Sequence, residues 1–199
     1  MTRIRTAFIV GVIAAVFFSP SALYASDATD QLGATVERVL PIINHTPRAQ
    51  LMAEGLPENA RKLILARFDF AEMTKRSLGQ HWGKLSRTEQ KQFIDAFTQW
   101  QLKSLGKLVV SSRAREIQFT REIHNGKEVK VETRMIGEYA GDLPIEYWLH
   151  NQKGQWKVHN IVIDNIDNVQ NIRAQFDRVI AKSSLNQLLQ KIKDQSAVA

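Results

Sequence analysis

The period of the hydrophobic pattern changes twice along this chain, and that change restricts the fold more than any other feature. From Arg115 to Ile163 apolar and polar residues alternate, which predicts strands with one buried face. Helical spacing returns at Asn168. Before Arg115 the apolar residues recur at helical spacing, beginning with Leu32, Val36, Val39, Leu40 and Ile43. Helices, then about four antiparallel strands, then helices predict an α+β fold, with helices packed on one face of a curved sheet.

Polar residues with capping geometry predict where two helices begin. Asp69 precedes Glu72 by three residues, the spacing of an N-cap and the third helical position. Ser86 and Glu89 repeat this spacing before a long helix that is expected to extend to Val110. Both segments are therefore predicted as helices with defined starts.

Proline and glycine divide the rest of the helical region. Pro41 is expected to kink or end the first helix, and Gly55–Pro57 to separate it from a second helix over Ala60–Arg67. Further along, Asn125-Gly126 predicts a hairpin that pairs Glu116–Arg121 with the strand that follows.

Residues 1–25 have the features of a secretory signal peptide. Arg3 and Arg5 are basic, and Ala7–Phe18 is an apolar run too short to span a bilayer. Small residues within Ser21–Ala25 then offer a cleavage site. We expect cleavage after Ala25, which leaves residues 26–199 as one exported domain, with an uncleaved N-terminal anchor as the alternative.

Cysteine content and charge exclude several classes of protein. The chain of 199 residues has no cysteine, which excludes disulfide scaffolds, thiol nucleophiles and zinc–thiolate or iron–sulfur sites. Removing the two arginines of the leader leaves 25 basic and 20 acidic residues, a charge of +5. The basic residues are scattered and form no polybasic tract. For an exported protein this charge favours transient contact with anionic membrane surfaces or acidic partners, and no nucleic acid.

The sequence offers no catalytic constellation. Its five histidines lack metal-site spacing, and there is neither a nucleophile-elbow motif nor a glycine-rich phosphate loop. Asp164 and Asp167 precede a helix, where capping explains them better than acid–base chemistry. We therefore predict no catalytic residue, no metal site and no cofactor.

Large apolar residues are the remaining candidates for function. Phe93, Phe97 and Trp100 on the long helix are expected to face Tyr147, Trp156 and Val158 on the sheet. Either these residues fill a closed core or they surround a cavity, and composition does not distinguish the two. The candidate lining, chosen by face periodicity, comprises Phe93, Phe97, Trp100, Val131, Met135, Tyr147, Leu149, Trp156, Val158, Ile172 and Phe176.

Several motifs in the same order give the chain a family resemblance over roughly residues 35–195. They are Phe68-Asp69-Phe70-x-x-Met73, Leu78-Gly79-Gln80-His81-Trp82, Glu89–Phe97, Gly154-x-Trp156-Lys157-Val158 and Asn171-Ile172-Arg173-x-Gln175-Phe176. With them the chain resembles the toluene-tolerance family, the MlaC-type periplasmic phospholipid-binding components of the Mla ABC-transport system. It departs from the family at Ile172, where a tyrosine is usual.

This resemblance implies a function as well as a fold. The family fold holds acyl chains in an apolar cavity between sheet and helices. The function it implies is a periplasmic phospholipid carrier that moves between an outer-membrane lipoprotein–porin complex and an inner-membrane MCE-domain transporter, and so maintains outer-membrane lipid asymmetry. Two alternatives remain open: a carrier of another lipid such as a hopanoid, and a non-carrier adaptor between envelope proteins.

Overall fold

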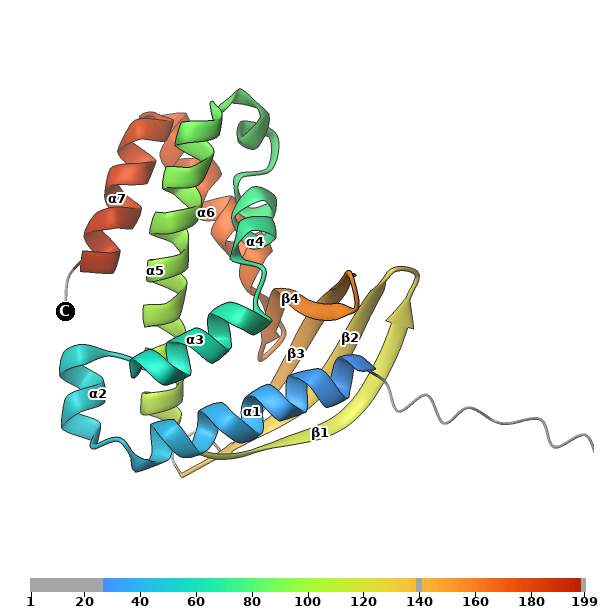
Figure 1. Cartoon of the computed structure of the whole chain (residues 1–199). Coiled ribbons are helices and arrows are strands. Elements are labelled where there is room, and N and C mark those ends of the chain that lie inside the picture. The colour runs from blue at the N-terminus through green and yellow to red at the C-terminus, as the bar shows by residue number, and fades with distance from the viewer. Residues whose placement is uncertain (1–26, 139–140, 198–199) are drawn as a thin grey trace, which may run out of the picture.

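The computed structural model describes residues 27–138 and 141–197 and has the predicted α+β architecture (Figure 1). Within these residues the strands form one antiparallel meander of order β1-β2-β3-β4-β5. The predicted leader, residues 1–25, lies outside the described residues. The strands are β1 (Ala114–Asn125), β2 (Glu128–Gly137), β3 (Gly141–Gln152), β4 (Gln155–Ile163) and the two-residue β5 (Ile166–Asp167).

Helices precede and follow this sheet. Seven α-helices and one short 3₁₀ helix, η1, lie within the described residues. Their bounds are α1 (Asp27–His45), α2 (Arg48–Glu54), α3 (Glu58–Arg67), α4 (Phe70–Leu78), η1 (Gly79–Lys84), α5 (Arg87–Ser112), α6 (Asn168–Lys182) and α7 (Leu185–Ala197).

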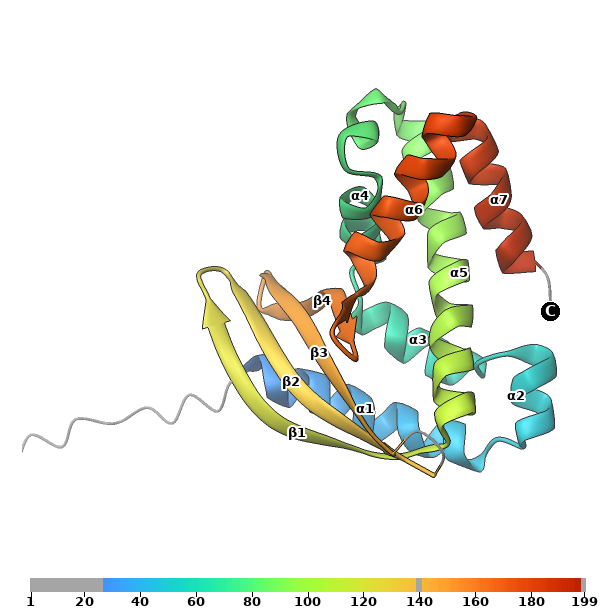
Figure 2. The same cartoon turned by 180° about the vertical axis from the view of Figure 1, so that it is seen from behind.

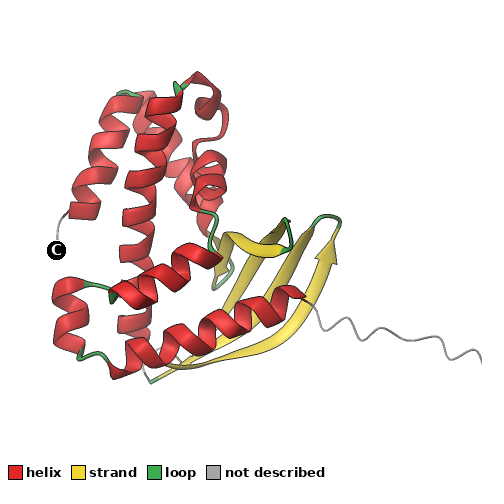
Figure 3. Cartoon of the chain, viewed as in Figure 1, coloured by secondary structure: helices red, strands yellow, loops and turns green. Residues whose placement is uncertain are grey.

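The helices divide into two groups around the long helix α5. Helices α1 and α3 lie against one face of the sheet, whereas α4, α6 and α7 pack around the end of α5 that is far from β1 (Figures 1 and 2). Coloured by secondary structure, the sheet occupies one side of the molecule and the helical bundle the other (Figure 3). The molecule therefore has a helix-on-sheet layer joined to a helix bundle through α5.

The sheet is curved, and its register explains part of the curvature. Asn125 pairs with Glu128 across the Asn125-Gly126 turn, so the predicted hairpin is confirmed. Register shifts interrupt the β1–β2 ladder between Phe119 and Arg121, and such irregularities increase local twist and bend a strand. The concave face that results receives α1 and α3 (Figure 1).

The predicted helix starts are confirmed by their hydrogen bonds. The Ser86 hydroxyl accepts from the Glu89 amide at 3.3 Å, and the Glu89 carboxylate accepts from the Ser86 amide at 2.8 Å. The Asp69 carboxylate accepts from the Glu72 amide at 2.9 Å. Local sequence therefore positions the start of both α4 and α5.

Of the two outcomes expected at Pro41, a kink or an end of the helix, the structure excludes the end, and it adds a helix between Pro47 and Gly55 that the sequence did not predict. Pro41 lies inside α1, which continues to His45, because packing of the amphipathic α1 on the sheet stabilises a helix that loses one backbone hydrogen bond. Residues 48–54 form α2 rather than an irregular link. Pro47 and Gly55 stand at its two ends, the positions where these residues are compatible with a helix.

The buried apolar residues form two cores. The helical core includes Phe93 and Phe97 of α5 with Phe176 of α6, and the sheet core includes Val131 of β2 and Leu149 of β3. Three partly buried residues pack against both cores: Phe68, Leu105 and Val109. The two cores therefore meet along the half of α5 that lies nearest the sheet.

Candidate functional site

An apolar pocket opens where the two cores meet, between α1, α3, α5 and the sheet. Its volume is about 100 Å³. The lining residues are Leu32, Thr35, Val36, Val39, Leu40, Ile43, Leu56, Ile64, Phe68, Leu105, Val109, Ala114, Ile117 and Tyr147.

The few polar groups of this apolar pocket are satisfied or neutral. The Thr35 hydroxyl donates to the Gln31 carbonyl and accepts from Arg67 Nε, both at 3.0 Å. Burial raises the pKa of the Tyr147 phenol to about 12, so the ring carries no charge at neutral pH. Among the described residues no charged side chain lines the pocket, which therefore suits an uncharged apolar chain.

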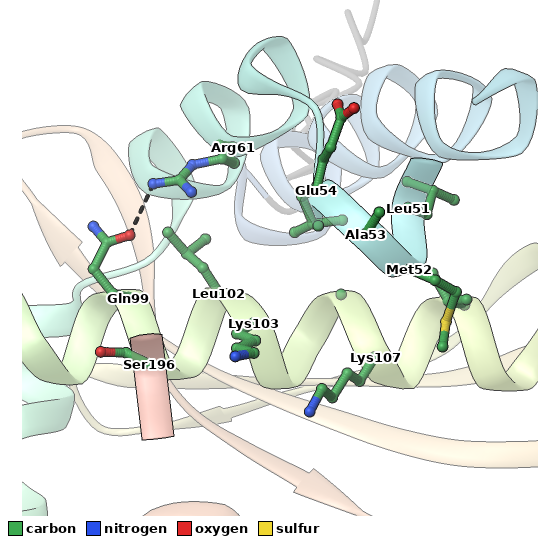
Figure 4. Close-up of a pocket in the computed structure, with 14 residues that line it drawn as sticks. Leu51, Met52, Ala53, Glu54, Arg61, Gln99, Leu102, Lys103, Lys107 and Ser196 are labelled. Atoms are coloured by element: carbon green, nitrogen blue, oxygen red, sulfur yellow. Dashed lines mark hydrogen bonds between the residues drawn. The ribbon is translucent and has the colours of Figure 1, made fainter. Parts of the chain in front are cut away.

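A second hollow, the α2–α5 groove, lies beside the apolar pocket and has a volume of about 220 Å³. Figure 4 shows Lys103 and Lys107 along α5, with Arg61 donating to Gln99 at 2.9 Å. The groove is lined by Leu51, Met52, Ala53, Glu54, Gly55, Leu56, Arg61, Gln99, Leu102, Lys103, Gly106, Lys107, Val110 and Ser196. Leu56 lines both the groove and the apolar pocket.

The sheet residues of the predicted lining lie together in the sheet core. Val131 and Leu149 are fully buried there, and Trp156 is half-buried against the same core. Among the eleven predicted residues, Tyr147 borders the apolar pocket. The members of this group are Val131, Met135, Tyr147, Leu149, Trp156 and Val158.

The helical residues of the predicted lining lie in the other core. Rings of Phe97 and Phe176 meet edge-to-face with centroids 6.4 Å apart, and the Trp100 ring lies 6.1 Å from Phe176. Phe97 and Trp100 therefore face α6, and Phe93 lies in the same helical core, so the expected pairing of these residues with the sheet is wrong. The reason is that this half of α5 belongs to the helix bundle. The members are Phe93, Phe97, Trp100, Ile172 and Phe176. Contact of either group with a ligand stays a prediction.

A family model described as the MlaC protein matches residues 34–194. The chain belongs to the MlaC family. Among solved structures it is similar to the phospholipid-binding protein from Ralstonia solanacearum, determined in complex with a phospholipid. The two share 19% sequence identity with a TM-score of 0.72, and the match covers 86% of this chain and 98% of that one. At this identity the likeness shows a common fold. Comparison with curated proteins finds no match.

The pocket residues that face periodicity missed come mainly from α1 and the second half of α5. Val36 and Leu40 belong to the apolar stripe visible in the sequence of α1, and Leu105 to the stripe of α5. Val109 lies outside that α5 stripe, which already indicated that α5 is covered on more than one side. The sequence shows each stripe, but the two stripes meet only in the folded MlaC-family chain.

A cluster of ionisable residues lies where α4 approaches the sheet. His150 Nε2 and Asp69 Oδ2 are 3.0 Å apart, and Arg76 donates to Glu128 at 2.8 Å. His159 is buried, and its Nε2 lies 3.3 Å from Glu128 Oε1 without a hydrogen bond. These contacts join α4 to β2 and β3, and His159 of β4 lies against Glu128 of β2.

Residues 27–138 and 141–197 lack two further kinds of feature. Nowhere in them do three or more histidine, aspartate or glutamate side chains gather in a way that would hold a metal ion. None of their helices combines the length and apolar character needed to cross a membrane.

Proposed function

We propose that this MlaC-family chain is a periplasmic carrier that binds a phospholipid by its acyl chains. The observation that carries the proposal is the apolar pocket between helices and sheet, which no charged side chain of the described residues lines. The family match and a fold shared with a phospholipid-binding protein crystallised with its lipid support it. In this role the protein is a binding protein and not an enzyme.

The energetics of lipid transfer explain why such a carrier must enclose the chains. A diacyl lipid has about 30 methylenes, each worth ~0.8 kcal/mol when it is removed from water. Exposure during transit would cost over ~20 kcal/mol, whereas a bilayer and an apolar pocket bury the chains comparably. Net transfer is then close to balanced, so its direction must come from the complexes at either end.

The partners follow from the family and from the sequence. We propose that the carrier moves between an outer-membrane lipoprotein–porin complex and an inner-membrane MCE-domain transporter, and thereby maintains outer-membrane lipid asymmetry. Export by the leader of residues 1–25 would place it in the periplasm. A charge of +5 on residues 26–199 favours transient contact with anionic membrane surfaces.

Native mass spectrometry of the full chain, expressed with its leader in a Gram-negative host, tests this function. We expect the purified protein to release the mass of a diacyl phospholipid on denaturation. Val36→Phe narrows the apolar pocket and should reduce the fraction of protein that carries lipid. Val179→Phe is the matched control, because Val179 packs against the helical core and does not line the pocket. Release of a hopanoid mass would identify another cargo. A bare polypeptide that takes up nothing from phospholipid vesicles would favour the adaptor.

A further inference from the structure

Leu56 separates the apolar pocket from the α2–α5 groove, and two glycines, Gly55 and Gly106, allow it to lie there. It follows Gly55, whose φ of 79° and ψ of −153° are accessible almost only to glycine. A Cβ added to Gly106 would lie 3.2 Å from Leu56 Cγ, so the absence of a side chain on this turn of α5 creates the notch that Leu56 fills. The leucine is 8% exposed.

Neither hollow alone is large enough for a phospholipid. An engineered cavity of about 150 Å³ holds a single benzene ring. The apolar pocket measures about 100 Å³ and the groove about 220 Å³, with Leu56 as a shared wall. Movement of Leu56 out of the Gly106 notch would join them into one continuous site.

The charges of the groove match a phosphodiester. Among the described residues, Arg61, Lys103 and Lys107 line it against one carboxylate, Glu54, which gives this part of the lining a net charge of +2. Lys103 Nζ donates to the Gln195 carbonyl at 3.4 Å. Within the described part of the chain neither Lys103 nor Lys107 forms an ion pair, so both ammonium groups are available to an anion.

We propose that the α2–α5 groove is the phosphate-binding part of the lipid site. Lys103 and Lys107 hold the phosphate, and an acyl chain passes the displaced Leu56 into the apolar pocket. This inference rests on the proposed phospholipid binding and adds the position of the head group and the path of the chain.

A disulfide between positions 56 and 106 tests the path. A Cβ on Gly106 would lie 3.2 Å from Leu56 Cγ, which is one bond from Leu56 Cβ, so the Cβ atoms of Leu56→Cys and Gly106→Cys fall close to disulfide range. The chain has no other thiol. The probe is uptake of radiolabelled phosphatidylglycerol from vesicles by delipidated protein. We expect the oxidised double variant to load roughly tenfold more slowly than the same protein after reduction. Equal rates would overturn the proposed path. Failure of the reduced and wild-type proteins to load would instead contradict the proposed function.

Charge reversal tests the phosphate site. Lys103→Glu with Lys107→Glu should lower phosphatidylglycerol uptake roughly tenfold, because like charges then meet at the groove. Lys182→Glu with Lys191→Glu is the matched control, since both lysines are exposed and lie outside the groove. Uptake of diacylglycerol, which lacks the phosphate, should be equal in the two double variants. Equal loss of both lipids would overturn the assignment. A third outcome concerns inorganic phosphate. If the lysine reversal abolishes phosphate binding but leaves phosphatidylglycerol uptake unchanged, the groove binds free anions and not the lipid head group.

Discussion

Among individual residues, His159 shows how burial changes chemistry without creating a catalytic site. Its ring is 5.1 Å from that of His150, and neither of its ring nitrogens has a hydrogen-bond partner within the described residues. Burial, helped by the positive charge of Arg76, lowers the pKa of His159 to about 4. Burial raises the pKa of Glu128, but hydrogen bonding to Arg76 and the nearby positive charges outweigh it, so the net shift is downward. His159 is thus a neutral core residue at neutral pH.

This assignment predicts the pH dependence of stability. An unfolded His159 takes up a proton near pH 6.5, whereas the folded residue resists it until about pH 4. The free energy of unfolding should therefore fall as the pH drops from 6.5 towards 4. His159→Phe should remove that part of the slope, while the charged and titratable groups that face the ring, Glu128, Arg76, Glu72 and His150, stay in place. Urea unfolding of both proteins across this range measures the difference, and parallel curves would contradict it.

Among the secondary-structure elements, α4 and α5 begin with similar N-caps, but only the cap of α4 also contacts the sheet. The Ser86–Glu89 box is exposed and local to α5. Asp69 caps α4 and also contacts His150 and Gln152 on β3. One carboxylate thus starts a helix and attaches it to the sheet.

Replacing each cap with alanine separates the two roles. Ser86→Ala should cost about 1 kcal/mol of stability, the usual value for a lost N-cap. Asp69→Ala should cost about 2–3 kcal/mol, because it also removes hydrogen bonds to the sheet. Guanidinium unfolding gives both free energies. Equal costs would mean that the contacts between Asp69 and β3 contribute nothing.

In the whole molecule, the helix bundle and the layer of α1 and α3 on the sheet serve different purposes in our proposal. The apolar pocket lies between α1, α3, α5 and the sheet, whereas the aromatic group of Phe97, Trp100 and Phe176 lies inside the helix bundle. In that proposal the bundle supports the fold, and the layer of α1 and α3 on the sheet provides the space for a lipid.

Shortening a buried side chain of the bundle should therefore lower the free energy of unfolding and leave lipid binding unchanged. Phe97 is fully buried and lines neither the apolar pocket nor the α2–α5 groove. Phe97→Ala should lower the free energy of unfolding by about 3–5 kcal/mol. The lipid bound per folded molecule, measured by native mass spectrometry, should stay unchanged. Loss of lipid at full folding would instead place Phe97 in contact with the ligand.

Local sequence alone determined the succession of helices, strands and helices, the capped starts of α4 and α5, the hairpin at Asn125-Gly126 and the motifs of the family, because each of these depends on residues close together in the chain. Periodicity also identified which faces are buried. It did not show which buried faces meet, since that depends on packing between distant segments. Phe97 therefore faces Phe176 instead of the sheet. Leu56, which lies in the helix-breaking segment Gly55–Pro57, separates the apolar pocket from the α2–α5 groove. Only the tertiary structure decided where the chain leaves space.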